Sequence, residues 1–443
     1  MLPADFHLTL TAHFEGRTLL GGEPFAIVRL SDRAAARIRA WVDGDPVGQD
    51  GPLARALVRA NLAQPVPPAR AAPPVSVVIP VRDRSIAPLL AALDSDDVII
   101  VDDASATDIV RSEAADVRYI RRAEQGGAGA ARNDGLAAAR HELVACIDSD
   151  CLPLEGWLDP LLAHFADPEL SAVAPRIVAQ DERQVVPAER EQVGVREASG
   201  AYALRAALGR YERDRSPLDR GPDPARVIPY GRVPFVPAAT IVVRRDLRFD
   251  ATLRGGEDVE FVWRVPYVRY EPAAQVAHGH RTDPRAWFSR RVYYGRTAAG
   301  ISRRHPGKAR PLNVSPWTTA AWVALAARRP LTAAAILGVA AALTARELDP
   351  RTAVQLVGLG SLRSGRVVAD ALTRPWWPLS AAAAAAFPRA RLPLAAALAT
   401  KTPLQLADDV AYGIGLWQGC LEQRTLDPLL PARPWKLTRI DLQ

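Results

Sequence analysis

Between residues 75 and 305, short apolar runs alternate with longer stretches of helical character. The runs "VSVVIPV", "VIIVDD", "VRYIRR" and "LVACIDSD" are rich in β-branched residues, which is typical of buried strands. The segment "GAGAARNDGLAAARH", between the last two runs, predicts a helix. This alternation predicts a parallel sheet with helices on both faces. In such sheets, ligands bind at the carboxyl ends of the strands.

Residues 1–64 show a different pattern. The segment "FHLTLTAHFEGRTLLGG" alternates apolar and polar positions, which predicts a hairpin with Gly21-Gly22 as its turn. The segment "SDRAAARIRAWVDG" predicts a helix capped by Ser31 or Asp32, and "PLARALVRANLAQP" predicts a second helix. We expect a small winged-helix-like α+β module.

Two further regions separate by composition. Residues 65–74 are proline-rich, which predicts a stiff linker. Residues 306–443 are rich in Ala, Leu and Trp and are expected to be helical. Their most apolar stretch, residues 330–345, is shorter than the ~20 residues that cross a bilayer. Arginines bracket this stretch, so two interpretations stay open: packed helices, or contact with a membrane surface.

Charge and cysteine content narrow the function classes. The formal charge is +7, from 56 Lys+Arg against 49 Asp+Glu, and no basic run with interleaved aromatics occurs. This balance suits an anionic ligand or a membrane surface and argues against nucleic acid. Three scattered cysteines make no disulfide framework, and the N-terminus lacks a signal-peptide pattern. The sequence therefore predicts a cytoplasmic location.

Acidic residues stand where predicted strands end. Asp148 and Asp150 follow one strand with a single serine between them, and Asp102 and Asp103 end another. The first pair can bind a hard divalent cation, or it forms a solvated turn. The second pair can accept hydrogen bonds from a ribose, or Asp103 simply caps the next helix.

A glycine-rich turn precedes the predicted helix "GAGAARNDGLAAARH". Gly126 and Gly127 would let backbone N–H groups approach an anion at the positive end of the helix, and Arg132 and Asn133 add donors. The turn lacks the G-x-G-x-x-G spacing of dinucleotide-binding folds.

Two further clusters lie later in the chain. Glu257 and Asp258 begin a helix after a Gly-Gly turn, where acids are stabilised by the macrodipole or serve as a general base. His278 and His280 form an H-x-H pair, which either packs in the protein or adds a nitrogen ligand to the same cation.

The order and spacing of these motifs resemble the family-2 glycosyltransferases, which have the GT-A fold, over residues 75–300. The resemblance implies that the nucleoside pocket is lined by Pro80, Arg82, Asp102 and Asp103, with Gly126, Gly127, Arg132 and Asn133 near the nucleotide. It also implies that Asp148 and Asp150 bind Mg²⁺ or Mn²⁺ at the diphosphate, and that His278, or else His280, is a further ligand. Asp258, in the E-D pair with Glu257, would be the catalytic base. The Q-x-x-R-W motif of processive members is absent, which argues against a polymer channel.

The same resemblance implies an inverting transfer of a hexose, most simply glucose from UDP-glucose. Residues 1–64 are also similar to PqqD-like peptide-recognition modules, and the three-part layout is similar to family members that glucosylate a peptide-derived cofactor precursor. The alternatives are a glycan or lipid-carrier acceptor, a sugar-1-phosphate nucleotidyltransferase, and a non-catalytic binding protein. A nucleotidyltransferase would have a Gly-rich signature after its first strand, where this chain has "PVRDRS".

Overall fold

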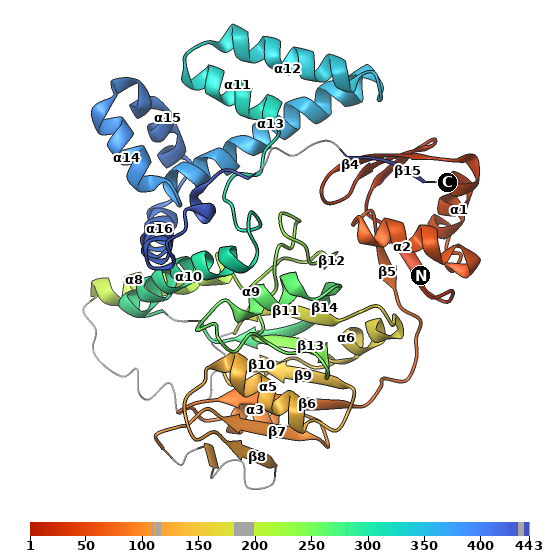
Figure 1. The fold of residues 1–443 in the computed structure, drawn as a ribbon, viewed down its shortest axis with the longest axis vertical. Helices are drawn as coiled ribbons and strands as arrows, with labels where there is room; N and C mark the ends of the chain where they lie inside the picture. Colours follow the sequence, from red (N-terminus) through yellow and green to blue (C-terminus); the bar gives the residue numbers. More distant parts are fainter. Residues whose placement is uncertain (108–109, 112–116, 181–198, 281, 433–437, 443) are drawn as a thin grey trace. The chain divides into compact units, whose positions relative to one another are not determined.

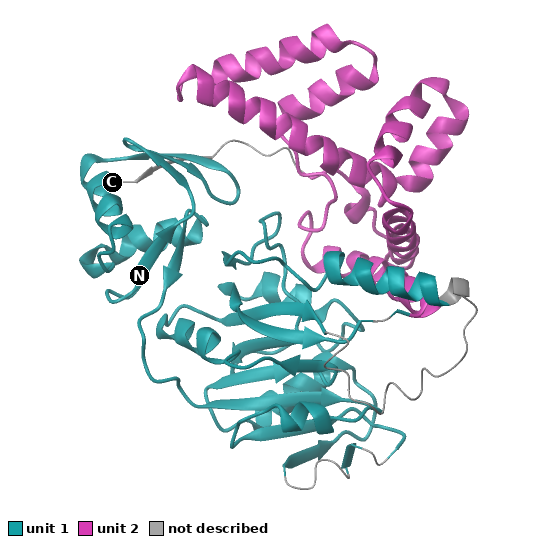
Figure 2. Ribbon diagram, turned by 180° about the vertical axis from the view of Figure 1, so that it is seen from behind, with its two compact units in different colours: residues 1–282, 437–443 teal, residues 283–436 magenta. Residues whose placement is uncertain are grey.

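The computed structural model describes all residues except 108–109, 112–116, 181–198, 281, 433–437 and 443. The chain divides into two compact units, residues 1–282 with 437–443, and residues 283–436 (Figure 2). The first unit contains a small N-terminal module and a large mixed α/β domain. The second unit is helical apart from short connections.

The N-terminal module combines two small sheets with two helices (Figure 1). One sheet pairs β1 with β5 in antiparallel fashion, and the other has the order β15-β4-β3-β2. The elements are β1 (His7–Leu10), β2 (His13–Glu15), β3 (Thr18–Gly21), β4 (Ala26–Leu30), α1 (Asp32–Val42), η1 (Gly48–Asp50), α2 (Gly51–Arg59), β5 (Ala63–Val66) and β15 (Thr438–Leu442).

The module confirms its predicted helices and corrects its boundaries. The Ser31 hydroxyl caps α1 by accepting a hydrogen bond from the Ala34 N–H at 3.1 Å. The first hairpin turns between β2 and β3 at residues 16–17, whereas Gly21 ends β3. Strand β5 includes Val66, so the module extends into the predicted linker. Strand β15 lies parallel to β4 and comes from a region that was predicted to be helical.

The large sheet has the order β10-β14-β11-β13-β9-β6-β7-β8, and β12 pairs with β14. The predicted parallel arrangement holds for β6, β7, β8 and β9. It is wrong for β13, which is antiparallel to both β9 and β11, and for β10, which is antiparallel to β14. The strands are β6 (Val75–Val81), β7 (Val98–Asp102), β8 (Arg118–Arg121), β9 (Leu143–Ile147), β10 (Cys151–Pro153), β11 (Ala172–Ala179), β12 (Ala225–Arg226), β13 (Thr240–Arg244) and β14 (Val268–His278).

Alternate residues of the strands enter two hydrophobic clusters, as a sheet covered on both faces requires. Val77 and Ile79 of β6 join one cluster, and Val78 joins the other. Gly135 of α5 packs so closely on β6 that a Cβ there would lie 2.2 Å from Val78 Cγ1. The helices of this domain are α3 (Ala87–Ala91), α5 (Ala128–Ala138), α6 (Asp159–Ala163), η2 (His164–Ala166), α8 (Ser199–Arg215) and α9 (Glu257–Arg264).

The second unit begins with α10, so the catalytic domain ends before the predicted boundary at residue 305. Its elements are α10 (Pro284–Arg304), α11 (Pro316–Ala326), α12 (Pro330–Thr344), α13 (Pro350–Thr373), α14 (Trp377–Ala386), α15 (Pro388–Ala399), α16 (Pro403–Gln423) and η4 (Asp427–Leu429). Helices α10 and α16 pack through Ala298, Ala299, Leu416 and Cys420. Among the described residues, no helix has the length and apolar character needed to span a membrane.

Candidate active site

The D-S-D motif lies in the turn between β9 and β10. The Asp148 N–H donates to the Ala239 carbonyl at 2.8 Å, and the Cys151 N–H donates to the Asp148 carbonyl at 3.0 Å. Cys151 then pairs with His278 across β10 and β14. This register brings the Asp150 carboxylate to 3.5 Å from His278 Nε2, so the second acid of the motif lies beside an imidazole.

Arg132 connects this turn to the E-D motif. Its side chain is buried, and it reaches Asp148 Oδ1 at 2.6 Å and Glu257 Oε1 at 3.1 Å. It also donates to the Ala238 carbonyl at 3.0 Å. The guanidinium lies over the Phe249 ring, 5.3 Å from its centroid. One buried cation therefore joins two motifs that are more than 100 residues apart in the chain.

Glu257 and Asp258 begin α9. Gly256 precedes them with φ of 74°, a left-handed conformation that glycine adopts without strain. Burial, together with the negative charge of Glu257, raises the pKa of Asp258 to about 7. This pKa gives the carboxylate the basicity of a group that can take up a proton near neutral pH.

The two acids of the D-S-D motif differ electrostatically. Burial raises the pKa of Asp148 to about 6, although the neighbouring Arg132 guanidinium opposes the shift. Burial would also raise the pKa of Asp150, but the hydrogen bond and charge of His278 outweigh it and lower that pKa to about 2. Asp150 is therefore a permanent anion at neutral pH, whereas Asp148 depends on Arg132 to stay charged.

The glycine-rich turn binds an anion that belongs to the protein itself. The amides of Gly126 and Gly127 donate to the Asp103 carboxylate at 2.8 and 2.7 Å, just before α5 begins. Gly127 has φ of 83°, which favours glycine there. Asp102 is fully buried and accepts from the Ser105 N–H at 2.8 Å and from the Arg121 guanidinium at 3.1 Å. Both acids hold loops at the carboxyl end of β7.

Comparison with known proteins identifies the family of the chain. The family model "Glycosyl transferase family 2" matches residues 76–221. The pre-mycofactocin glycosyltransferases of two Mycobacterium tuberculosis strains are 34% identical over 470 residues, covering 94% of this chain and 94% of each relative. The chain belongs to the pre-mycofactocin glycosyltransferase family.

Other similarities are narrower. Polypeptide N-acetylgalactosaminyltransferase 6 from Bos taurus is 34% identical over 92 residues, covering 19% of this chain and 15% of that protein. The solved structure of a Pyrobaculum calidifontis mannosyltransferase with GDP-Man and Mn²⁺ is 18% identical and covers 80% of this chain and 89% of that one, with a TM-score of 0.42. Family membership and the α/β sheet confirm the expected fold class, a GT-A glycosyltransferase domain with a helical C-terminal region.

In this family-2 glycosyltransferase, some predicted residues lie apart from the charged cluster. Pro80 is buried in β6, and Arg82 is exposed next to Asp83, at 3.5 Å. The Asn133 side chain donates to the Phe249 carbonyl at 2.9 Å and accepts from the Phe249 N–H at 2.8 Å. This pair of hydrogen bonds fixes the Phe249 backbone, and the contact of Asn133 with the nucleotide stays a prediction.

The two histidines of the H-x-H pair contact different acids. His280 Nδ1 lies 3.8 Å from Glu212 of α8, whereas His278 faces Asp150. Two residues outside the predicted site also matter: Phe249, which stacks on Phe261 at 4.3 Å beneath Arg132, and Arg84, whose charge lowers the pKa of Asp150. Arg84 lies in the loop that begins at the end of β6, so its place near a strand end could have marked it, whereas Phe249 carries no local signal.

Proposed function

We propose that the enzyme transfers glucose from UDP-glucose to a peptide-derived acceptor with inversion at the anomeric carbon. The observation that carries this proposal is the joining of the D-S-D and E-D motifs through the buried Arg132. An inverting transfer needs a site that holds positive charge at the leaving diphosphate, and it needs a base near the acceptor. Asp150 with His278 suits the first task, and Asp258 suits the second.

The residues present fit a divalent cation. Within the described part of the chain, no cluster of three or more His, Cys, Asp or Glu side chains forms a complete metal site. Mg²⁺ and Mn²⁺ commonly take only one or two protein ligands and leave positions for phosphate oxygens. The Asp150 carboxylate and the imidazole of His278, whose buried Nδ1 has no hydrogen-bond partner among the described residues, would supply these. When bound, the cation stabilises negative charge on the diphosphate.

Asp258 would act on the acceptor. Its carboxylate would take the hydroxyl proton as the acceptor oxygen attacks the anomeric carbon and the bond to the diphosphate breaks. A single displacement converts an α-linked donor to a β-linked product. Arg132 would hold Asp148 and Glu257 in place during this displacement, which keeps the D-S-D and E-D motifs aligned with one another.

A peptide-derived acceptor is favoured by the name of the 34%-identical relative, which refers to a pre-mycofactocin. A polysaccharide or a lipid-linked carrier is the second candidate acceptor. Nucleotidyl transfer is disfavoured because "PVRDR" follows the first strand of the large sheet, where those enzymes carry glycines.

Purified enzyme with Mn²⁺ and UDP-glucose provides the test. Adding a peptide-derived acceptor should cause release of UDP. The product should be a β-glucoside, which the large NMR coupling constant of its anomeric proton identifies. An α-linked product would contradict inversion. UDP release with a lipid-linked acceptor alone would move the acceptor assignment to the second candidate.

We also propose that the helical unit attaches the enzyme to the cytoplasmic face of a membrane. Large apolar side chains are exposed on its helices, with exposed fractions of 85% for Leu331, 70% for Leu362 and 63% for Val323. Arg328 and Arg329 lie between α11 and α12, where they could meet lipid headgroups. The cysteines at 146, 151 and 420 are unpaired, which suits a reducing compartment.

A further inference from the structure

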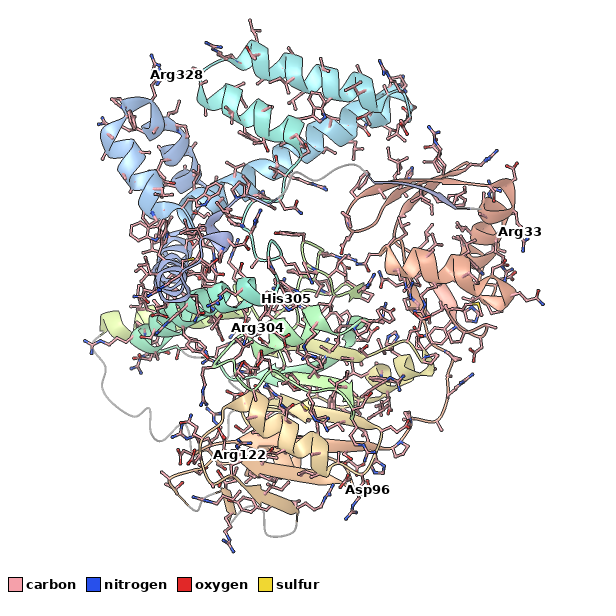
Figure 3. The ribbon with its side chains drawn as sticks, viewed as in Figure 1. Arg33, Asp96, Arg122, Arg304, His305 and Arg328 are labelled. Atoms are coloured by element: carbon pink, nitrogen blue, oxygen red, sulfur yellow. The ribbon has the colours of Figure 1, made fainter. Side chains whose placement is uncertain are left out.

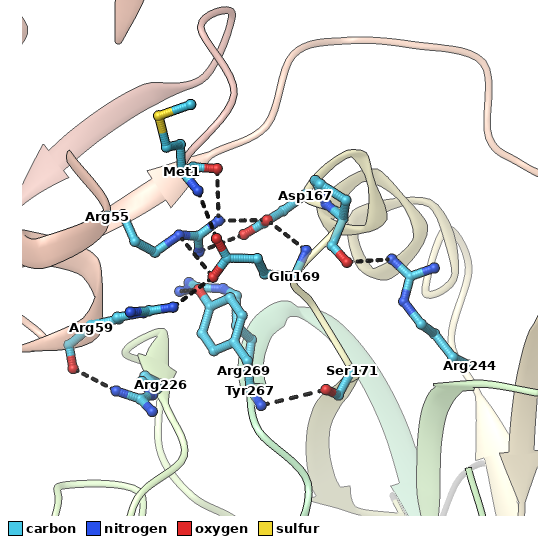
Figure 4. A network of polar contacts seen from close by, with 11 residues as sticks. Met1, Arg55, Arg59, Asp167, Glu169, Ser171, Arg226, Arg244, Tyr267 and Arg269 are labelled. Atoms are coloured by element: carbon cyan, nitrogen blue, oxygen red, sulfur yellow. Dashed lines mark hydrogen bonds and ion pairs between the residues drawn. The ribbon is translucent and has the colours of Figure 1, made fainter. Parts of the chain in front are cut away.

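The junction between the N-terminal module and the catalytic domain concentrates arginines (Figure 4). Helix α2 of the module contributes Arg55 and Arg59, and β12 of the catalytic domain contributes Arg226. The catalytic domain supplies two carboxylates to this network, Asp167 and Glu169. Together with Arg244 and Arg269, these guanidinium groups outnumber the two acids.

The two carboxylates are already occupied. Arg55 donates to both oxygens of Asp167, at 2.8 and 2.6 Å, in a buried bidentate pair. Arg59 lies 2.8 Å from Glu169, which also accepts from the amino group of Met1 at 2.7 Å. Such pairs use most of the acceptor capacity of each carboxylate. Neither acid is left to neutralise a third arginine.

Arg226 forms an ion pair with neither Asp167 nor Glu169. Its Nη1 donates to the main-chain carbonyl of Arg59 at 2.8 Å, and its guanidinium lies 5.8 Å from the centre of the Tyr267 ring. Its Nε is buried without a hydrogen-bond partner, and no carboxylate of the described residues forms an ion pair with it. Burial lowers the pKa of Arg226, and the charges of Arg59 and Arg55 lower it further, which is the behaviour of a cation without a counter-ion.

Arg226 lines a pocket of about 380 Å³. This volume falls at the lower end of the range for small-molecule sites. Arg59 also lines the pocket, and the remaining surface is mainly apolar, from Pro24, Ala26, Ala56, Ala60 and Ile228. Glu23 also borders the pocket, but its carboxylate accepts from Asn61 at 3.0 Å and lies 3.7 Å from Arg232. The pocket therefore combines an unneutralised guanidinium with apolar walls.

Asn61 fixes the two sides of the pocket to one another. Its Oδ1 accepts from the Arg226 N–H at 2.8 Å, and its Nδ2 donates to the Arg226 carbonyl at 3.2 Å. These bonds imitate a strand pairing between the module and the catalytic domain. A ligand in the pocket would meet a preformed surface, which reduces the ordering cost of binding.

We propose that this junction pocket binds a small carboxylate that has an apolar body. A guanidinium donates charge-assisted hydrogen bonds to a carboxylate, and the alanine, proline and isoleucine surface takes the apolar part. The pocket shares no residue with the Arg132 cluster, so its ligand site can be tested separately from the transfer chemistry. Its chemistry would select an acceptor, or another ligand, that ends in a carboxylate.

Calorimetry on the full chain tests this with a matched pair of probes, N-acetyl-leucine and N-acetyl-leucinamide. The acid should bind at least tenfold more tightly than the amide. Arg226→Gln should lower the affinity for the acid at least tenfold, and Arg226→Lys should lose less. Arg33→Gln, at an arginine with an 88% exposed side chain elsewhere in the module, should leave affinity unchanged.

A second variant tests the proposal independently, in case Arg226→Gln does not fold. Ile228→Glu keeps Arg226 and places a carboxylate in the pocket, so it should block the acid probe while metal-dependent UDP binding persists. Equal binding of the acid and the amide would overturn the proposal, as would full affinity in Ile228→Glu. If acetate bound as tightly as N-acetyl-leucine, the ligand's apolar body would contribute nothing, and that part of the proposal would be overturned.

Discussion

At the scale of single residues, Arg132 decides whether the site holds together. It lies between Asp148 and Glu257, and its positive charge opposes the rise that burial causes in the pKa of Asp148. Arg132→Met should therefore lower the free energy of unfolding by about 3 kcal/mol, because a buried cation is lost and its two acids stay behind. Urea unfolding at pH 7.5 measures this.

The exposed Arg33 provides the control, since its substitution should change stability by less than ~0.5 kcal/mol. Part of the loss in Arg132→Met should be recovered at pH 5, where Asp148 takes up a proton at little cost. Equal stability of the two variants would contradict the role given to Arg132.

Substituting the two histidines of the H-x-H pair should have different effects on metal binding. His278 faces Asp150, whereas His280 faces Glu212. His278→Ala should raise the Mn²⁺ concentration needed for half-maximal UDP binding about tenfold or more, while His280→Ala should change it little. This order of effect is typical when a metal site loses a supporting group. The reverse result would assign the ligand to His280.

Motif order in the sequence marks the candidate acids, but it does not predict which side chains and amides they contact. Asp148, Asp150 and Asp258 stand at recognisable places, at a strand end and a helix start. That the Gly126 and Gly127 amides bind Asp103, and that Asn133 pins Phe249, depends on loops meeting in space. No local sequence pattern predicts such contacts between distant loops.

At the scale of elements, the contact between α10 and α16 depends on glycine. A Cβ at Gly415 would lie 1.8 Å from the Val292 carbonyl oxygen, and one at Gly295 would lie 2.0 Å from the Tyr412 carbonyl oxygen. Gly415→Ala should therefore push the two helices apart and destabilise the second unit by about 2 kcal/mol. Thermal unfolding monitored by circular dichroism measures the change.

Gly338 of α12 is the matched control, because a Cβ there meets nothing within 4 Å. Gly338→Ala should stabilise the helix by about 0.5–1 kcal/mol. Destabilisation by both substitutions to the same extent would show that helix packing is not the cause.

Elements were predictable where a period or a cap marks them. The strands β6, β7 and β9 and the Ser31 cap follow from apolar runs and from N-cap chemistry. The antiparallel direction of β13 did not follow, because an apolar strand shows the same pattern whichever way it runs. Its direction depends on the long connections before it.

At the scale of the whole molecule, strand β15 returns the end of the chain to the module. Its short sequence "TRIDL" follows a long helical region, and its parallel partner β4 lies more than 400 residues earlier. Pairings of such long range are not visible in a single sequence. Composition, by contrast, predicts a module, a catalytic domain and a helical region directly from the sequence.

The proposed membrane attachment also belongs to this scale. The intact protein should float with vesicles containing anionic lipid and should bind less in high salt, because Arg328 and Arg329 would contribute charge attraction. Leu331→Glu combined with Leu362→Glu should reduce flotation several-fold by placing charge on the exposed apolar surface. Unchanged flotation in this double variant, or none by the wild type, would contradict the attachment.

The most direct test of the central claim compares wild type with Asp258→Asn. With its pKa raised to about 7, Asp258 is protonated below that pH, so wild-type transfer should increase as the pH rises through about 7. Asp258→Asn should lower kcat by ~10²- to 10⁴-fold while leaving Mn²⁺-dependent UDP binding within threefold. A variant that keeps more than a tenth of wild-type transfer would show that Asp258 is not the base.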